Sequence, residues 1–483
     1  MNLPGRRSTE RRTHGGPETV ASRVRRVGEV RAVTAVLAVV SLACGWLALR
    51  PERSSAAVEV AARPVWTPDR LPAMLAEAQG TVDLERAVDD LLATTGGVRT
   101  CLAVYDGQRP VLLRNPDQTL VPASTQKILV GIAALAVLGP GFRYETKVVS
   151  DAPPRDGGVG TVWLIGSGDP TLATPEYVAW LAERPRFALH QATALVALAD
   201  GLKAAGVTSV TGGIVGDDAR YDRVRIVPGW KDNYVVDNEA GPLGALAVNA
   251  GFTVFEPPEK RADDPAAHAA SELARLATAA GIAVTGPARS GSAPPAEDAV
   301  TLATVRSAPL SEVVAGMIRE SDNTAAELIV KELGVATRRD GSTAAGTQAV
   351  ADALAEAGLP TAGLRMGDGS GLDVSNQASC ALLTAALRLP DGSGAPRLGR
   401  SMAVAGRTGT LSLRLAGTPL EGKLRAKTGS LNGVSGLAGY VDGRRSLTFA
   451  FLANGPLSDS AGRLLQDRLV ALLAGYPGPQ PRL

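Results

Sequence analysis

Histidine is scarce in this sequence. The 483 residues contain three histidines, at positions 14, 190 and 268. His14 lies in a polar tail, whereas His190 and His268 lie in alanine-rich stretches predicted to be helical, where we expect ordinary surface or packing roles. No G-x-S-x-G segment occurs either. A catalytic triad that depends on histidine is therefore poorly supported.

Cysteine is equally rare, with three residues at positions 44, 101 and 380. This number is too small for a disulfide framework or a zinc cage, so we predict no metal and no cofactor. Cys44 lies in an apolar segment, which leaves Cys101 and Cys380 as a possible pair. They form a disulfide if the chain folds in an oxidising compartment, and two buried free thiols are the open alternative.

Net charge is close to balance, at +2 from 50 basic and 48 acidic residues. Such a chain lacks the overall basic field that is typical of nucleic-acid-binding proteins, so we expect no nucleic-acid partner. Lysine is the rarer of the two main basic residues, because only 8 of those 50 are lysines. Two lysines placed inside motifs are therefore harder to attribute to chance.

Positive charge is concentrated at the N-terminus. Residues 1–31 hold eight arginines against three glutamates, and residues 32–49 follow without a single charge. We interpret 1–31 as a cytoplasmic basic tail, 32–49 as a membrane signal anchor and 50–75 as a linker, which places the rest outside the cytoplasm. Small residues at Ser55-Ala56-Ala57 leave a cleaved signal peptide and secretion as an alternative. A buried helix is a third and weaker interpretation.

The rest of the chain is long enough for two structural units, since 45% of the sequence is hydrophobic. A hairpin is predicted around Asp106-Gly107 and an apolar helix over 124–138. The texture between 149 and 301 changes to short strands and glycine turns, which indicates an inserted unit. Further helices and strands are predicted over these ranges: helices at 191–205, 265–280, 308–333, 343–357, 376–388 and 461–474, and a strand series at 422–454.

The first of three short motifs is Ser124-Thr-Gln-Lys127, at the start of the apolar helix. Spacing of three residues puts the serine hydroxyl and the lysine amine on one helix face. Apolar neighbours disfavour the ammonium form, so a neutral Lys127 can accept the proton of Ser124. The alternative is that Ser124 is only a helix cap and Lys127 a solvated residue.

The second and third motifs are Ser321-Asp-Asn323 and Lys427-Thr428-Gly429. We predict Ser321 as a proton relay and Asn323 as a hydrogen-bond partner of a substrate peptide group. Alternatively, Thr324 and Glu327 have the spacing of a capping box, which explains this region as a helix start.

Lys427 lies in a strand candidate and would supply positive charge to a substrate carboxylate. Thr428 adds a hydroxyl, Gly429 allows close backbone approach, and the Ser430 N–H, with that of Ser124, would stabilise an oxyanion. An exposed strand lysine beside a turn glycine is the alternative. The order of the three motifs on a helix, a loop and a strand favours a common site.

These motifs resemble those of penicillin-binding proteins and serine beta-lactamases, and in particular the class C low-molecular-weight D-alanyl-D-alanine carboxypeptidases of peptidase family S13. Additional similarity is carried by four segments: Gly168-Asp-Pro-Thr-Leu172, Asp217-Asp-Ala-Arg-Tyr-Asp222, Asp368-Gly-Ser-Gly-Leu372 and Arg425-Ala-Lys-Thr-Gly-Ser-Leu431. The resemblance implies an α/β (α+β) fold in which an antiparallel sheet is flanked by helices. Residues 76–148 and 302–483 would form this transpeptidase-like catalytic domain, and 149–301 a β-rich insertion of one or two domains.

The resemblance also implies the activity. Ser124, Lys127, Ser321, Asn323 and Lys427 would catalyse cleavage between two D-alanines of a peptidoglycan stem peptide through an acyl-enzyme at Ser124. Beta-lactams would act as covalent inhibitors, and cross-link endopeptidase activity is expected as well. Two alternatives stay open: a beta-lactamase of the same fold, although no E-x-x-L-N segment is present, and a non-catalytic cell-wall-binding protein.

Overall fold

The computed structural model describes residues 71–390 and 398–478. The predicted basic tail, the predicted membrane segment and most of the predicted linker lie outside these residues. Over the two described ranges, no helix is both long and apolar enough to cross a membrane.

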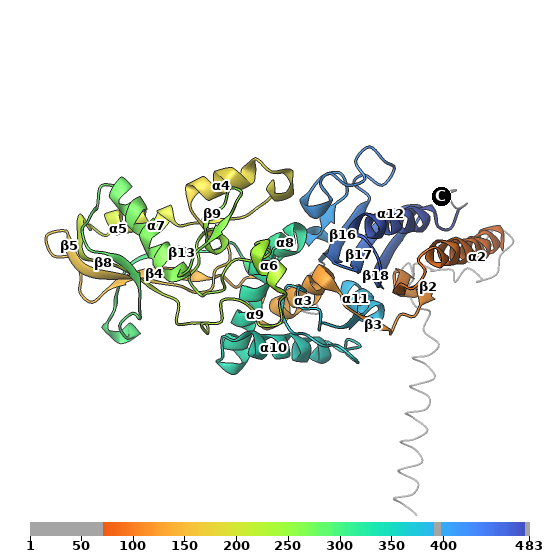
Figure 1. The fold of residues 1–483 in the computed structure, drawn as a ribbon, viewed down its shortest axis with the longest axis horizontal. Helices are drawn as coiled ribbons and strands as arrows, with labels where there is room; N and C mark the ends of the chain where they lie inside the picture. Colours follow the sequence, from red (N-terminus) through yellow and green to blue (C-terminus); the bar gives the residue numbers. More distant parts are fainter. Residues whose placement is uncertain (1–70, 391–397, 479–483) are drawn as a thin grey trace, which may run out of the picture. The chain divides into compact units, whose positions relative to one another are not determined.

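A six-stranded antiparallel sheet has the strand order β15-β16-β17-β18-β1-β2, and its strands β16, β17 and β18 lie side by side in Figure 1. Its first hairpin confirms the turn predicted at Asp106-Gly107, and the predicted strand series after 422 becomes three consecutive strands. The bounds are β1 (Arg99–Asp106), β2 (Arg109–Arg114), β15 (Ala403–Val404), β16 (Leu424–Leu431), β17 (Val434–Asp442) and β18 (Ser446–Asn454).

Helices cover both faces of this sheet. Successive side chains of a strand point to opposite faces, so Cys101 and Ala103 enter one core while Leu102 and Val104 enter the other. The first core is closed by α3 (Lys127–Val137), α8 (Leu310–Glu320), α9 (Asn323–Arg338), α10 (Thr343–Glu356) and α11 (Cys380–Leu387). The second is closed by α2 (Leu71–Ala93) and α12 (Asp459–Gly475). An antiparallel sheet between two helical layers is the predicted fold class.

A second six-stranded sheet is built from the chain between the first two motifs, in the order β11-β8-β5-β4-β13 with β12 also pairing β8. It is mixed: β11, β12 and β5 pair parallel with β8, whereas β4 pairs antiparallel with both β5 and β13 and is the one reversed strand of the sheet. Helices α5 and α7 pack on it. The bounds are β4 (Glu145–Ser150), β5 (Gly158–Ile165), α5 (Val196–Ala204), β8 (Ser209–Asp217), α7 (Pro265–Ala279), β11 (Ala283–Val284), β12 (Ala288–Ser290) and β13 (Val300–Arg306).

Two predicted helices, at 191–205 and 376–388, are shorter than expected, and the one predicted at 308–333 is divided into α8 and α9. The alanine-rich stretch becomes helical only at Val196, so His190 lies in a loop and not on a helix. Smaller elements complete the described chain: β3 (Thr119–Leu120), β6 (Leu172–Ala173), α4 (Pro175–Ala182), β7 (Thr193–Ala194), α6 (Asp232–Val236), β9 (Phe252–Val254), β10 (Lys260–Arg261) and β14 (Ala378–Ser379).

A disulfide joins Cys101 of β1 to Cys380 at the start of α11. Both residues are fully buried in the core between the sheet and α11. Of the two alternatives left open by the sequence, the structure contains the disulfide and not two free thiols. Disulfides persist in oxidising compartments, which agrees with the predicted export of the chain.

Replacing both cysteines should destabilise the protein, because the bridge closes a loop of 279 residues in the unfolded chain. We expect Cys101→Ala/Cys380→Ala to lower the free energy of unfolding by about 2–5 kcal/mol in urea denaturation. Thiol titration of the full chain in denaturant without reductant should detect one reactive group, Cys44. Three reactive groups would show that the bridge does not form.

Candidate active site

The first motif lies in a 3-10 turn, η1 (Ala123–Gln126), that leads directly into α3. Lys127 Nζ lies 2.9 Å from Ser124 Oγ. The lysine side chain is fully buried, whereas Ser124 is partly accessible. The predicted pairing of these two groups on one face of the helix start is therefore present.

Two glycines allow other segments to approach the Ser124 turn closely. A Cβ on Gly371 would lie 2.1 Å from the carbonyl oxygen of Ala123, and one on Gly429 would lie 2.8 Å from that of Pro122. Side chains at these positions would push the turn away, because real Cβ atoms do not approach backbone this closely. Gly429 thus admits the backbone that carries Ser124, which brings the first and third motifs together.

Lys127 is held by two further acceptors. Its Nζ lies 2.6 Å from Asn323 Oδ1 and 2.6 Å from the main-chain oxygen of Ser370. Burial lowers the pKa of Lys127 from 10.5 to about 8 and outweighs the opposing attraction of nearby carboxylates such as Asp368. A substantial fraction of this amine is therefore neutral in weakly alkaline solution.

The second motif spans the junction between α8 and α9. Ser321 ends α8 in the left-handed conformation, with φ of 59°. Asp322 caps α9, because its carboxylate accepts the Ala325 N–H at 2.9 Å. The capping box proposed for Thr324 and Glu327 is therefore wrong: the helix begins two residues earlier and another side chain caps it.

The third motif lies on β16. Lys427 is fully buried, and its Nζ donates to Ser321 Oγ at 2.8 Å and to the main-chain oxygen of Thr428 at 2.8 Å. Burial, with the charges of Lys127 and Arg186, holds the pKa of Lys427 well below its usual range. The exposed-lysine alternative is wrong, and all three motifs meet in one site.

The neighbouring substrate-site candidates lie along the same strand. Thr428 Oγ1 donates to Thr410 Oγ1 at 3.1 Å, and Ser430 is exposed to solvent. Within the described residues, β15 pairs with β16 only at Arg425 and Ala426. The outer edge of β16 beyond Ala426 therefore has no strand beside it in that part of the chain.

The turn at residues 368–376 supports the site, and the sequence did not reveal its role. Asp368 accepts hydrogen bonds from Trp230 Nε1 at 2.9 Å, Asn376 Nδ2 at 2.7 Å and the N–H of Gly371 at 2.9 Å. This buried carboxylate shapes the turn that presents the Ser370 oxygen to Lys127. In the sequence, the run Asp368-Gly-Ser-Gly371 indicates only a similarity to the family.

Glu327 of α9 fixes the same turn from the other side. Its Oε1 accepts the N–H of Gly369 at 3.0 Å and that of Ser370 at 2.6 Å. Burial, reinforced by the charge of Asp368, raises the pKa of Glu327 to about 7. Its function in the structure is to satisfy two buried amides.

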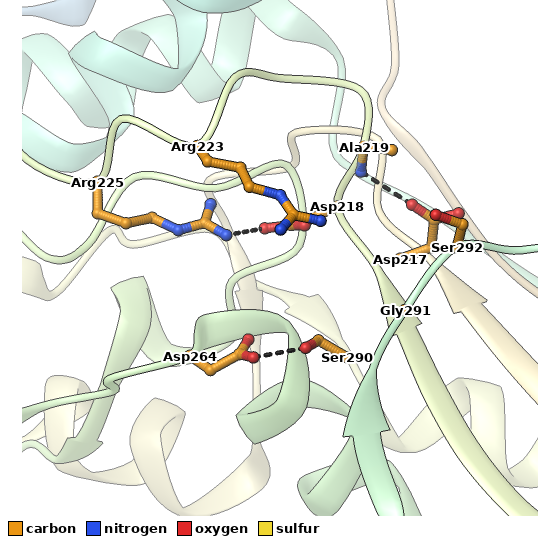
Figure 2. Close-up of a pocket in the computed structure, with 9 residues that line it drawn as sticks. All are labelled: Asp217, Asp218, Ala219, Arg223, Arg225, Asp264, Ser290, Gly291 and Ser292. Atoms are coloured by element: carbon orange, nitrogen blue, oxygen red, sulfur yellow. Dashed lines mark hydrogen bonds and ion pairs between the residues drawn. The ribbon is translucent and has the colours of Figure 1, made fainter.

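A separate cavity of about 60 Å³ lies at the ends of β8 and β12 beside the start of α7 (Figure 2). It is lined by Asp217, Asp218, Ala219, Arg223, Arg225, Asp264, Ser290, Gly291 and Ser292. None of these belongs to the three motifs, although the first three lie in the family-similarity segment 217–222. Arg225 pairs with Asp218, and Ser290 with Asp264. This cavity is distinct from the site of the three motifs. Across the described ranges, no group of His, Cys, Asp and Glu side chains is arranged to hold a metal ion.

Three features meet on this fold: a serine with a buried lysine at a helix start, a Ser-x-Asn loop and a Lys-Thr-Gly strand. This combination defines the class of penicillin-interacting serine enzymes. The model of the D-Ala-D-Ala carboxypeptidase 3 (S13) family matches residues 84–262 and 256–476. The chain belongs to this family.

Sequence and structure comparisons with individual proteins agree with this family assignment. The chain is 30% identical to a D-alanyl-D-alanine carboxypeptidase of Actinomadura sp. (strain R39), over 89% of this chain and 91% of the relative. It is 34% identical to a carboxypeptidase of Mycobacterium tuberculosis, over 74% and 76%. The fold is similar to that of penicillin binding protein 4 of Haemophilus influenzae, with a TM-score of 0.65 and 20% identity over 79% of this chain and 99% of that one.

Removing the Glu327 carboxylate should destabilise the protein, because two buried N–H groups would lose their acceptor. We expect Glu327→Ala to lower the free energy of unfolding by about 2–4 kcal/mol in urea. Glu327→Gln is the matched control, since its amide oxygen can still accept both bonds. Equal stability of the two variants would contradict the role given to these hydrogen bonds.

Proposed function

We propose that this protein is a serine D-alanyl-D-alanine carboxypeptidase that acts on peptidoglycan stem peptides. Membership in the S13 family supports the activity, and one observation supports the residue assignment: the 2.9 Å contact between Ser124 Oγ and a fully buried Lys127 Nζ. A lysine whose pKa is lowered to about 8 can act as a general base near neutral pH.

Acylation follows from these contacts. The neutral Lys127 amine takes the hydroxyl proton while Ser124 Oγ attacks the carbonyl between the two D-alanines. The N–H groups of Ser124 and Ser430 stabilise the oxyanion. As the C–N bond breaks, Ser321 passes a proton to the departing nitrogen and receives the proton held by Lys127, so terminal D-alanine leaves and both groups regain their starting states. Water then hydrolyses the ester at Ser124 and restores the enzyme.

Substrate binding uses the outer edge of β16. An extended peptide can add there as a further strand, with its carboxylate near Lys427 and its side chains near Thr428. The low pKa of Lys427 in the free site is consistent with this role, because an arriving carboxylate favours the ammonium form. Asn323 already bonds Lys127 and the Glu239 oxygen, and its second amide hydrogen is available to a substrate peptide group.

The same site can accept other acyl donors. A stem peptide whose leaving nitrogen belongs to a neighbouring stem would be cut as a cross-link, which makes endopeptidase activity part of the proposal. A beta-lactam would acylate Ser124 and remain bound as an ester. No cofactor enters any of these steps.

The organisation of the chain is part of the proposal. Residues 76–148 with 302–483 would form the catalytic unit and 149–301 the inserted unit. Both boundaries fall inside strands of the second sheet, β4 and β13. Residues 32–49 would anchor the protein to the membrane, with catalysis outside the cytoplasm. The uncharged run after a basic tail, a cell-wall enzyme family and a disulfide support this arrangement.

Ser124→Ala should abolish both D-alanine release from a pentapeptide stem and covalent labelling by fluorescent penicillin, because the acyl acceptor is lost. The exposed Ser460→Ala on α12 is the control and should keep both activities. Labelling retained by Ser124→Ala would assign the nucleophile to another residue.

The rate of acylation should rise with pH through a midpoint near 8. The pKa of Lys127 is lowered to about 8, so raising the pH through this value increases the neutral amine that accepts the proton. Stopped-flow measurement of beta-lactam acylation from pH 6 to 10 tests this. Lys127→Met should acylate at least about 100-fold more slowly without that rise, while Lys203→Met on α5 serves as control. A profile that is flat between pH 7 and 9 would refute the role of the amine.

A further inference from the structure

The residue before the second motif, Glu320, is held by a loop far away in the sequence. Arg186, in the 3-10 turn η2 (Pro185–Phe187), donates from both Nε, at 2.8 Å, and Nη2 to the main-chain oxygen of Glu320. His190 Nδ1 lies 2.7 Å from Glu320 Oε2. One short loop, residues 186–190, therefore contacts both the backbone and the side chain of Glu320.

The Glu320 side chain is buried and has only 1% of its surface exposed. Its second oxygen, Oε1, accepts from Arg319 Nη2 at 3.1 Å, and the same nitrogen reaches the main-chain oxygen of Leu189 at 2.7 Å. The loop at 186–190 therefore donates hydrogen bonds to the end of α8 through Arg186, and α8 donates one to the loop through Arg319. A buried carboxylate needs such partners, since an unpaired charge would be strongly destabilising.

The hydrogen bonds from Arg186 to the main-chain oxygen of Glu320 also restrain the backbone of Ser321. The Glu320 carbonyl and the Ser321 N–H belong to one planar peptide unit. Ser321 is in the left-handed conformation, which is unfavourable for a residue with a side chain unless its surroundings impose it. This conformation directs Ser321 Oγ to Lys427 Nζ at 2.8 Å.

We propose that Arg186 and His190 are positioning residues that hold Glu320, and through it keep Ser321 aligned between Lys427 and the departing nitrogen. This inference rests on the proposed function, because it explains how the relay serine of that reaction is oriented. It also assigns a role to the chain between the first two motifs, which supplies the loop. A second contact from the same chain, Asn323 Nδ2 to the Glu239 oxygen at 2.7 Å, restrains the motif from its other end.

Charge gives Arg186 an additional effect on the site. Its guanidinium lowers the pKa of Lys127 and of Lys427, although burial is the main cause of both shifts. Removing the charge should therefore raise the pKa of Lys127. A lysine at position 186 would keep the charge but could not donate from two nitrogens in the fork geometry of arginine.

The contact between His190 and Glu320 depends on pH, because the imidazole can gain or lose a proton. Burial and the charge of Arg319 disfavour its protonation, but the hydrogen bond and charge of Glu320, with the charge of Asp322, outweigh them and raise the pKa of His190. A further carboxylate near His190 is that of Glu312 on α8, because both residues line the same small cavity. A raised pKa means that the charged contact with Glu320 is present at low pH and is lost as the pH rises through the folded-state value.

The test compares Arg186→Gln, Arg186→Lys and His190→Asn with the wild type. We expect Arg186→Gln to slow beta-lactam acylation roughly 10- to 100-fold and to move the midpoint of its pH profile to higher pH. Arg186→Lys should restore the midpoint but only part of the rate. Arg184→Gln is the matched control, because Arg184 lies in the same segment but contacts Trp180 and not Glu320.

Amide hydrogen exchange over residues 318–325 supplies a readout that does not need activity. We expect faster exchange there in Arg186→Gln and His190→Asn, with unchanged exchange in β17 and β18. Acylation within twofold of wild type together with unchanged exchange at 318–325 would overturn the proposal, as would a uniform loss of protection. If the wild type itself is not acylated, the proposed function fails, and the exchange data still decide whether the loop holds Ser321.

Discussion

Burial of the Lys127 amine is the constraint on which the site depends. The side chain has no solvent exposure, and its Nζ is surrounded by Ser124 Oγ, Asn323 Oδ1 and the Ser370 carbonyl oxygen. Burial disfavours the ammonium ion, whereas three oxygen acceptors and nearby carboxylates favour it. The balance leaves the pKa near 8, so the amine can both lose and regain a proton during one catalytic cycle. Without the buried position it would remain charged, and without the acceptors a buried amine would have no fixed place.

Much of the surrounding structure serves to keep these groups in place. Glu327 and Asp368 hold the turn that offers the Ser370 oxygen, and Gly371 and Gly429 allow that turn and β16 to close around Ser124. The contacts of Ser124 and Lys127 are thus held in place largely by residues outside the three motifs. The chain between the first two motifs contributes to the same alignment through Arg186 and His190. A preorganised site of this kind needs little rearrangement at the moment of reaction.

Local chemistry made the motifs and the main elements predictable from sequence. The Ser124–Lys127 spacing, the apolar helix after it, the hairpin at Asp106-Gly107 and the last three strands follow from periodicity and turn residues that act over a few positions. Support from distant residues was not predictable. In the sequence, Asp368 resembles any turn aspartate, the spacing of Glu327 is typical of a capping box, and His190 lies in a stretch that predicts a helix. Each of these side chains gains its role from a partner more than 40 residues away, such as Glu320 for His190 at a separation of 130.

The most direct test of this account is a titration of Lys127 itself, followed by NMR of side-chain-labelled lysine. With 8 lysines in the chain, the spectrum is simple enough to assign by comparing wild type with Lys127→Met and Lys427→Met. The account predicts that the Lys127 signal titrates near pH 8 in the free protein. A Lys127 signal that titrates near 10.5, the ordinary value for an exposed lysine, would contradict it.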